Sequence, residues 1–249
     1  MVLSIAKWVG KVAVVTGASS GIGAAIVDRL IEKGVIVVGI ARRVELIEKR
    51  AKSCTVKEKL YAVKADITKE DQILKALKWV EDNVGPIHVL INSAGVILLK
   101  GLTETSTEDM KTILELNVLG LSIITREVVK MMQAHKISGH IIHINSTFGH
   151  QVMSHAFSIY PASKFAVTAL TETLRQELNS LGLKIKVTSV SPGLVATEMT
   201  TLNKDILPEA KEMFDKIAIL QPADVVDAVV YALSTPEHVQ VHELTLTGL

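Results

Sequence analysis

The chain has 249 residues, a net charge of +1 with histidine neutral, 48% hydrophobic residues and only 4% aromatic residues. A near-zero charge argues against a nucleic-acid-binding protein, because such proteins carry a clear basic excess and often use aromatic side chains for base stacking. No apolar run approaches the roughly 20 residues needed to cross a bilayer, so we expect no membrane span.

Apolar runs alternate with helical patterns along the chain. Seven runs predict strands: Lys11–Thr16, Val35–Ile40, Lys59–Val63, His88–Ile91, His140–Asn145, Lys184–Val190 and Val239–Leu246. Six stretches between them have helical character: Gly21–Lys33, Val44–Lys52, Lys69–Asn83, Thr107–His135, Ser158–Leu181 and Pro222–Leu233. This alternation predicts an α/β fold, a Rossmann-type doubly wound parallel sheet of about seven strands with helices on both faces.

We expect one domain over residues 1–249, because no long linker, repeat or low-complexity segment interrupts the alternation. The longest insertion, residues 198–221, lies between the sixth and seventh predicted strands. Its apolar spacing is amphipathic, and we expect it to form a substrate-binding lid; a helix that simply packs is the alternative.

A glycine turn joins the first strand to the first helix, in the sequence TGASSGIG (residues 16–23). Gly17 permits a tight turn, Gly21 lets a pyrophosphate approach the backbone, and Gly23 permits close helix packing. The helix N-terminus then favours the anion. The spacing G-x-x-x-G-x-G differs from the usual dinucleotide fingerprint, and an ordinary glycine turn is the alternative, but the strand-turn-helix context favours nucleotide binding.

The second strand ends without the acidic residue that binds the ribose 2′-hydroxyl of NAD in such folds. Arg42 and Arg43 follow the strand, and the first acid is Glu45. Arginine matches phosphate geometry with paired hydrogen bonds. Although two arginines can merely solvate a helix start, the missing acid together with two cations favours NADP(H) over NAD as the cofactor.

Tyr160 and Lys164 are four residues apart at the start of a predicted helix and therefore share one helix face. A phenol has an unperturbed pKa of about 10, and a neighbouring ammonium group and an oxidised nicotinamide both lower that pKa. Ser146 follows the fifth predicted strand, at the sheet edge where such folds bind ligands. Its hydroxyl is placed to bond a substrate oxygen.

These motifs, in this order and spacing, resemble those of the classical short-chain dehydrogenase/reductase family over nearly the whole chain. The resemblance is carried by TGASSGIG (16–23), Asp66, NSAG (92–95), Asn117, Ser146, YPASK (160–164) and PGLVAT (192–197). It implies an oxidoreductase with Tyr160 as general acid/base, Lys164 lowering its pKa and binding the nicotinamide ribose, and Ser146 orienting the substrate. Asn117 would hold a water in a proton relay to Lys164.

The resemblance also implies the cofactor contacts. They come from Gly17, Ser19, Ser20, Gly21, Ile22, Gly23, Arg42, Arg43, Asp66, Ile67, Asn92, Ala94, Gly95, Tyr160, Lys164, Pro192, Gly193, Val195 and Thr197. One departure is Ser93, where the family usually has a second asparagine that braces the sheet, so the change bears on local stability more than on catalysis.

VVGIARR, HIIHINSTFGH and VTALTETLRQEL resemble one branch of the family, with NADP-dependent farnesol dehydrogenases and animal carbonyl and ketosteroid reductases. We therefore expect a small hydrophobic alcohol or carbonyl as substrate, most simply a farnesol-type alcohol. We expect its contacts from Val96, His150, Val152, Met153, Phe157, Leu194, Met199, Met213 and Phe214. The long helices over Thr107–His135 and Ser158–Leu181 resemble those that pair in family dimers, so we expect a homodimer or homotetramer.

Other chemistries fit the sequence less well. His150 and His155 lie near the expected pocket without a carboxylate or cysteine motif, so we expect no metal. Ser146 lacks the G-x-S-x-G turn of a hydrolase nucleophile. Cys54 is the single cysteine, cannot form an internal disulfide and fits a reducing compartment, so we expect a cytoplasmic protein. A non-catalytic nucleotide sensor on the same fold is the alternative to an enzyme.

Overall fold

The computed structural model describes residues 3–53, 60–201 and 218–249. The strands are β1 (Val12–Thr16), β2 (Ile36–Ala41), β3 (Leu60–Lys64), β4 (Ile87–Asn92), β5 (His140–Ile144), β6 (Lys186–Pro192) and β7 (Glu243–Leu246). The helices are α1 (Gly21–Glu32), α2 (Val44–Ser53), α3 (Glu70–Asn83), α4 (Thr107–Leu114), α5 (Leu121–Ala134), α6 (Tyr160–Ser180), α7 (Glu198–Thr201) and α9 (Pro222–Ser234).

The strands form one sheet in the order β3-β2-β1-β4-β5-β6-β7, and every neighbouring pair is parallel. This confirms the predicted doubly wound sheet. The strand order reverses between β1 and β4, which lie side by side although two strands separate them in the sequence. A ligand of such a sheet binds outside the carboxyl ends of the strands at this reversal.

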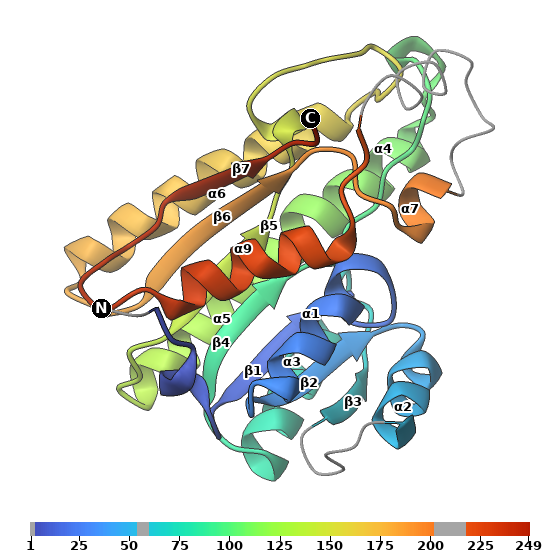
Figure 1. Cartoon of the computed structure of the whole chain (residues 1–249). Coiled ribbons are helices and arrows are strands. Elements are labelled where there is room, and N and C mark those ends of the chain that lie inside the picture. Colours follow the sequence, from blue (N-terminus) through green and yellow to red (C-terminus); the bar gives the residue numbers. More distant parts are fainter. Residues whose placement is uncertain (1–2, 54–59, 202–217) are drawn as a thin grey trace.

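Helices cover both faces of the sheet (Figure 1), and a cluster of mostly aliphatic side chains packs on each face. On one face, α1 and α9 lie side by side and pack on alternate strand residues such as Val15, Ile91 and Val190. On the other face, α3, α5 and α6 pack on the residues between, including Val14 and Leu90. Successive side chains of a strand point to opposite faces, so strands buried on both faces are apolar at nearly every position.

The predicted helix over Thr107–His135 is confirmed as helical over residues 107–134, but it is not α-helical along its whole length. A π-helical segment, η3 (Glu115–Gly120), separates α4 from α5. Gly120 lies close to the loop that precedes α3, and a Cβ added to it would stand 2.5 Å from the carbonyl oxygen of Ile67. The wider turn accommodates this approach and turns Asn117 into the interior, and π-turns of this kind are frequent at functional sites.

Several predicted boundaries shift by one or more residues, and two of these shifts have a clear structural reason. β7 begins at Glu243 rather than Val239, because side chains of β6 bind the preceding backbone: Lys186 Nζ donates to Val239 O at 2.9 Å and Thr188 Oγ1 donates to Val241 O at 2.7 Å. α6 begins at Tyr160 rather than Ser158, whose φ of 45° lies outside the helical region. Within the described ranges, no helix is both long enough and apolar enough to cross a membrane.

Candidate active site

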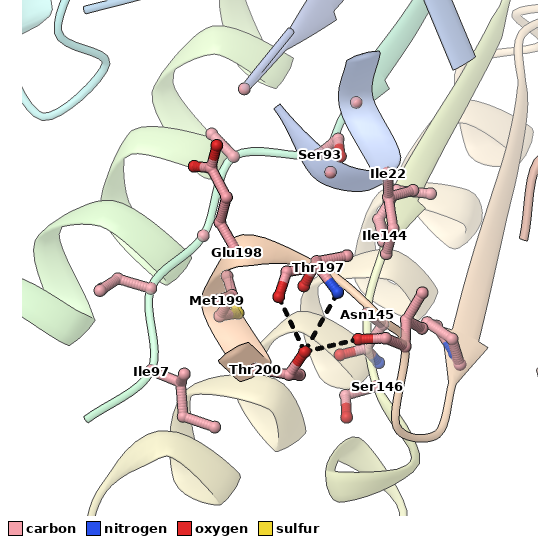
Figure 2. A pocket seen from close by; sticks show the side chains of 18 of the residues that line it. Ile22, Ser93, Ile97, Ile144, Asn145, Ser146, Thr197, Glu198, Met199 and Thr200 are labelled. Carbon is pink, nitrogen blue, oxygen red and sulfur yellow. Dashed lines mark hydrogen bonds between the residues drawn. The ribbon is translucent and has the colours of Figure 1, made fainter. Parts of the chain in front are cut away.

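A cavity of about 440 Å³ opens across the carboxyl ends of the central strands (Figure 2). Its volume lies in the range that holds small ligands and cofactors. One side is formed by the glycine turn after β1 and by the residues after β2, and the other by Ser146, Tyr160 and the segment after β6. The cavity therefore brings together residues that are far apart in the sequence.

The glycine turn forms a bare backbone cradle in this cavity. Gly17 and Gly21 have φ values of 67° and 57°, which glycine adopts without strain. An added Cβ on Gly17 would lie 2.8 Å from Ala94 Cα, and one on Gly23 would lie 2.4 Å from Gly17 O. Ser20 makes no side-chain capping bond, so the first N–H groups of α1 are left for an anion. These features fit a dinucleotide pyrophosphate.

The residues after β4 are tied to β1 by one hydroxyl. Thr16 Oγ1 accepts hydrogen bonds from the backbone N–H groups of Ser93 at 3.1 Å and Ala94 at 3.2 Å. Ser93, Ala94 and Gly95 line the cavity, whereas Asn92 does not. Asn92 is buried and donates from Nδ2 to Thr125 Oγ1 on α5 at 2.9 Å. Its side-chain amide thus bonds within the core, and its direct contact with the cofactor stays a prediction.

The candidate acid/base group lies at the start of α6. Tyr160 is the first residue of the helix, Lys164 lies one turn further, and both line the cavity with Ser146. Lys164 Nζ stands 5.7 Å from the centre of the Tyr160 ring and donates to Ile144 O at 3.0 Å. The arrangement can place a hydroxyl, a phenol and an ammonium group around one substrate oxygen.

Burial has the largest effect on the pKa values of Tyr160 and Lys164. It raises the pKa of Tyr160 to about 12, and a hydrogen bond with Ser146 acts in the opposite direction but is the smaller effect. Burial also lowers the pKa of Lys164 to about 8. Because a low-dielectric environment disfavours charge, the phenol is protonated at neutral pH in the protein alone. A phenolate then needs an additional positive charge nearby.

Asn117 lies beneath the cavity rather than on its wall. Its side chain forms a pair of bonds with the backbone of Val96, accepting from Val96 N and donating to Val96 O, both at 2.9 Å. Asn117 Nδ2 also lies 3.2 Å from Ser163 Oγ on α6. The side chain thus joins η3, the residues after β4 and α6. The π-turn that presents it has no sequence signal that we recognised.

The expected substrate contacts divide into three groups. Val96, Met153, Phe157, Leu194 and Met199 line the cavity. His150 and Val152 do not line it, and their contacts with substrate stay predictions: His150 Nε2 lies 3.0 Å from Ser191 Oγ and 3.4 Å from Glu243 Oε2, while Val152 is 65% exposed. Met213 and Phe214 lie outside the described residues.

The remaining predicted cofactor residues all line the cavity, and some lining residues were not predicted. The first set comprises Gly17, Ser19, Ser20, Gly21, Ile22, Gly23, Arg42, Arg43, Asp66, Ile67, Pro192, Gly193, Val195 and Thr197. The second includes Asn145, Gln151, Glu198, Thr200, Thr247 and Gly248. A signal existed for Asn145 and Thr247, because each lies at or just beyond the carboxyl end of a predicted strand.

Backbone hydrogen bonds with Leu220 hold the segment that follows β6 in place. Ala196 N donates to Leu220 O at 2.8 Å, and Leu220 N donates to Leu194 O at 2.9 Å. Thr200 Oγ1 lies within hydrogen-bonding distance of two carbonyl oxygens, Val195 O at 2.8 Å and Thr197 O at 2.9 Å. It also accepts a hydrogen bond from Thr197 N at 3.1 Å (Figure 2). These bonds fix the backbone between β6 and α7, where Glu198 and Met199 enter the cavity wall.

Metal ligands do not gather in the part of the chain that the structure describes: no group of three or more histidine, cysteine or acidic side chains there could hold a metal ion. His140 and His143 are buried in β5 and bond to threonines, His140 Nε2 to Thr188 Oγ1 at 2.9 Å and His143 Nδ1 to Thr171 Oγ1 at 2.8 Å.

Comparisons with known proteins agree with this geometry. The family model described as short chain dehydrogenase matches residues 11–206. Farnesol dehydrogenase from Aedes aegypti is 48% identical over 96% of each chain, and dehydrogenase/reductase SDR family member 11 from Mus musculus is 42% identical over 96% of this chain and 95% of that one. A solved structure of serine dehydrogenase in its closed form, complexed with NADP+, superposes with a TM-score of 0.86 and 30% identity over 94% of each chain.

Proposed function

The chain belongs to the short chain dehydrogenase family, and we propose that it is an NADP-dependent enzyme that transfers hydride between the nicotinamide and a hydrophobic alcohol or its carbonyl compound, with a farnesol-type isoprenoid alcohol as the preferred substrate. Membership of the family makes the protein an NAD(P)-dependent oxidoreductase. The choice of NADP and the choice of substrate are our proposals. We also propose a cytoplasmic enzyme, since the single cysteine cannot form an internal disulfide.

The observation that carries the NADP preference is the composition of the cavity wall after β2. Arg42 and Arg43 line it, and the acid that would bind a ribose 2′-hydroxyl from the end of β2 is absent. A guanidinium group matches the oxygen geometry of a phosphate. Serine dehydrogenase, which has the same fold, was solved with NADP+.

The chain's own residues supply binding, orientation and proton transfer, while the nicotinamide supplies the hydride acceptor or donor. In the oxidising direction, Ser146 Oγ holds the substrate hydroxyl and the Tyr160 phenolate removes its proton as hydride leaves the carbinol carbon. In the reducing direction, the Tyr160 phenol protonates the carbonyl oxygen as its carbon receives hydride. Lys164 stabilises the phenolate, because an ammonium group lowers a neighbouring phenol's pKa.

The cavity wall on the substrate side favours an apolar molecule. Val96, Ile97, Leu99, Phe157 and Leu194 line it, and all are apolar. Met199 joins them from α7, and methionine adapts to irregular ligands such as a branched isoprenoid chain. The 48% identity to a farnesol dehydrogenase supports the isoprenoid alcohol within this class.

Reduction of carbonyl compounds, including ketosteroids, is the second candidate. It is favoured by the protonation of Tyr160: with the pKa raised to about 12 by burial, the phenol is ready to donate a proton at neutral pH. The same residues perform both reactions, so the candidates differ in substrate and direction rather than in machinery.

A cofactor-by-substrate panel tests the proposal. Purified protein is assayed by nicotinamide absorbance with NADP and NAD, against farnesol, geraniol, simple ketones and steroids. We expect NADP with farnesol to give the highest kcat/KM. Higher kcat/KM with NAD would overturn the assignment of Arg42 and Arg43, and faster reduction of steroids or simple ketones than oxidation of farnesol would replace the first candidate substrate by the second.

A further inference from the structure

One ion pair spans the mouth of the cavity and has no part in the proposed hydride transfer. Arg43 Nη2, beyond the end of β2, donates to Glu198 Oε2 at 2.9 Å and to Ser20 Oγ at 2.8 Å. The side chains of Arg43 and Glu198 are 50% and 52% exposed, and both residues line the cavity. The pair thus joins the proposed phosphate site to the first residue of α7.

Glu198 takes this position because of the fixed backbone beside it. Thr200 holds the turn from Val195 to Thr197, and α7 begins immediately afterwards with Glu198. In Figure 2 the Glu198 side chain extends away from Ser146. The carboxylate therefore points to the arginine side of the cavity. It is not one of the proposed reacting groups, which are those of Ser146 and Tyr160.

The occupied guanidinium is one of the two arginines that we assign to the 2′-phosphate. Its Nη2 already donates to both Glu198 and Ser20, and the Glu198 carboxylate at 2.9 Å offsets part of its positive charge. A phosphate monoester carries up to two negative charges at neutral pH and would be repelled by that carboxylate. Hydrogen bonding with Arg43 also lowers the pKa of Glu198, so the carboxylate is ionised at neutral pH.

We propose that Glu198 is a specificity-determining residue: its carboxylate must leave Arg43 before the guanidinium can bind the 2′-phosphate of NADP(H). Glu198 therefore limits how strongly the enzyme prefers NADP over NAD, which has no phosphate to compete. This inference rests on the proposed NADP preference and goes beyond it by naming the competing group on the protein itself.

The test is direct binding of NADP+ and NAD+, measured by isothermal titration calorimetry without substrate. Glu198→Gln keeps the size of the side chain and removes its charge. We expect this change to lower the Kd of NADP+ about three- to fivefold, the range expected for an exposed charge interaction, and to change the Kd of NAD+ less than twofold. The gain should shrink at high salt, because exposed charges are screened.

Asp227→Asn is the matched control, because Asp227 forms an exposed ion pair with Arg29 at 2.7 Å, away from the cavity. It should leave both dissociation constants unchanged. In an Arg43→Ala background, Glu198→Gln should lower the Kd of NADP+ less than twofold, because the guanidinium for which the carboxylate and the phosphate compete is absent. Thermal melting of each variant verifies that it is folded.

The outcomes separate this inference from the proposed function. Wild-type protein that binds NAD+ more tightly than NADP+ would refute the NADP preference itself. If the wild type prefers NADP+ but Glu198→Gln leaves its Kd unchanged or raises it, Glu198 does not compete for Arg43. If Glu198→Gln lowers the Kd of NADP+ by the full three- to fivefold even without Arg43, the carboxylate does not act by occupying the Arg43 guanidinium.

Discussion

Burial of Tyr160, the proposed acid/base, opposes the phenolate form that nearby positive charges favour. The residue is 7% exposed, and burial raises the pKa of its phenol to about 12. Lys164, 6% exposed, has its pKa lowered to about 8 by the same cause. Burial therefore favours the neutral form of both groups, and the charge on an oxidised nicotinamide would favour the phenolate that alcohol oxidation needs.

The pH dependence of the two directions should differ in sign. Oxidation needs the phenolate, and burial raises the pKa of the Tyr160 phenol to about 12, so kcat/KM for the alcohol should rise with pH over the range below that pKa. Reduction needs the phenol, so kcat/KM for the carbonyl compound should stay level and then fall as pH rises. Initial rates in both directions, in buffers of constant ionic strength, check this. An oxidation rate that falls steadily over the same range would contradict Tyr160 as the base.

At the scale of single elements, the start of α1 depends on close backbone contacts. Gly23 packs against the turn that precedes its own helix, and the turn in turn approaches Ala94 after β4. A side chain anywhere in this contact separates elements that the cavity needs together. The glycines are therefore required by packing as well as by the cofactor.

Gly23→Ala should disturb both fold and binding. Its Cβ would stand 2.4 Å from Gly17 O, so the helix must shift, and overpacking of this kind costs about 1–3 kcal/mol. We expect a lower melting temperature and weaker NADP+ binding. Gly101→Ala is the control, because its φ is −64° and a Cβ there would meet nothing within 4 Å. Equal melting temperatures and affinities for the two variants would contradict the packing argument.

The π-segment η3 shows how one element can carry a site that periodicity does not reveal. Helical spacing runs through Thr107–His135 without a break, yet the chain widens at Glu115–Gly120 and places Asn117 beneath the cavity. At the end of this segment Gly120 approaches the Ile67 carbonyl group, where an added Cβ would stand 2.5 Å from the oxygen. Local patterns contain no information about such a contact, so the interruption lay beyond prediction.

For the whole molecule, the sheet could be predicted because its strands are buried on both faces. Runs such as residues 12–15 are apolar throughout, and parallel order follows from the helices between them. The glycine turn, Ser146, Tyr160 and Lys164 could be predicted too, since strand ends and helix starts fix their places. The direction of the His150 side chain and the partner of Arg43 depend on distant residues, and no local pattern contains them.

The assembly of the molecule is a further prediction at this scale. We expect a homodimer or homotetramer in which α6 and the helices on either side of η3 contact a second copy. Leu119 of η3 and Phe165 of α6 are 53% and 42% exposed, so each can offer an apolar side chain to such a contact. Sedimentation velocity should give a dimer or a tetramer.

A charge on that surface should disrupt the assembly. Phe165→Arg is expected to shift sedimentation toward the monomer, because an unpaired buried charge is costly at an interface. Tyr231→Arg on α9 is the control, since Tyr231 is 45% exposed on the other face of the sheet. A wild-type protein that sediments only as a monomer would contradict the prediction.

Tyr160→Phe tests most directly whether Tyr160 transfers the proton in an NADP-dependent oxidoreductase. The variant removes the phenolic hydroxyl and keeps the ring that packs against Phe148, and its turnover and NADP+ affinity are measured in one preparation. We expect a loss of kcat of about 10²- to 10⁴-fold, the usual size of an acid/base contribution, with the Kd of NADP+ unchanged within about twofold. Near-normal turnover in this variant would rule out Tyr160 as the group that transfers the proton.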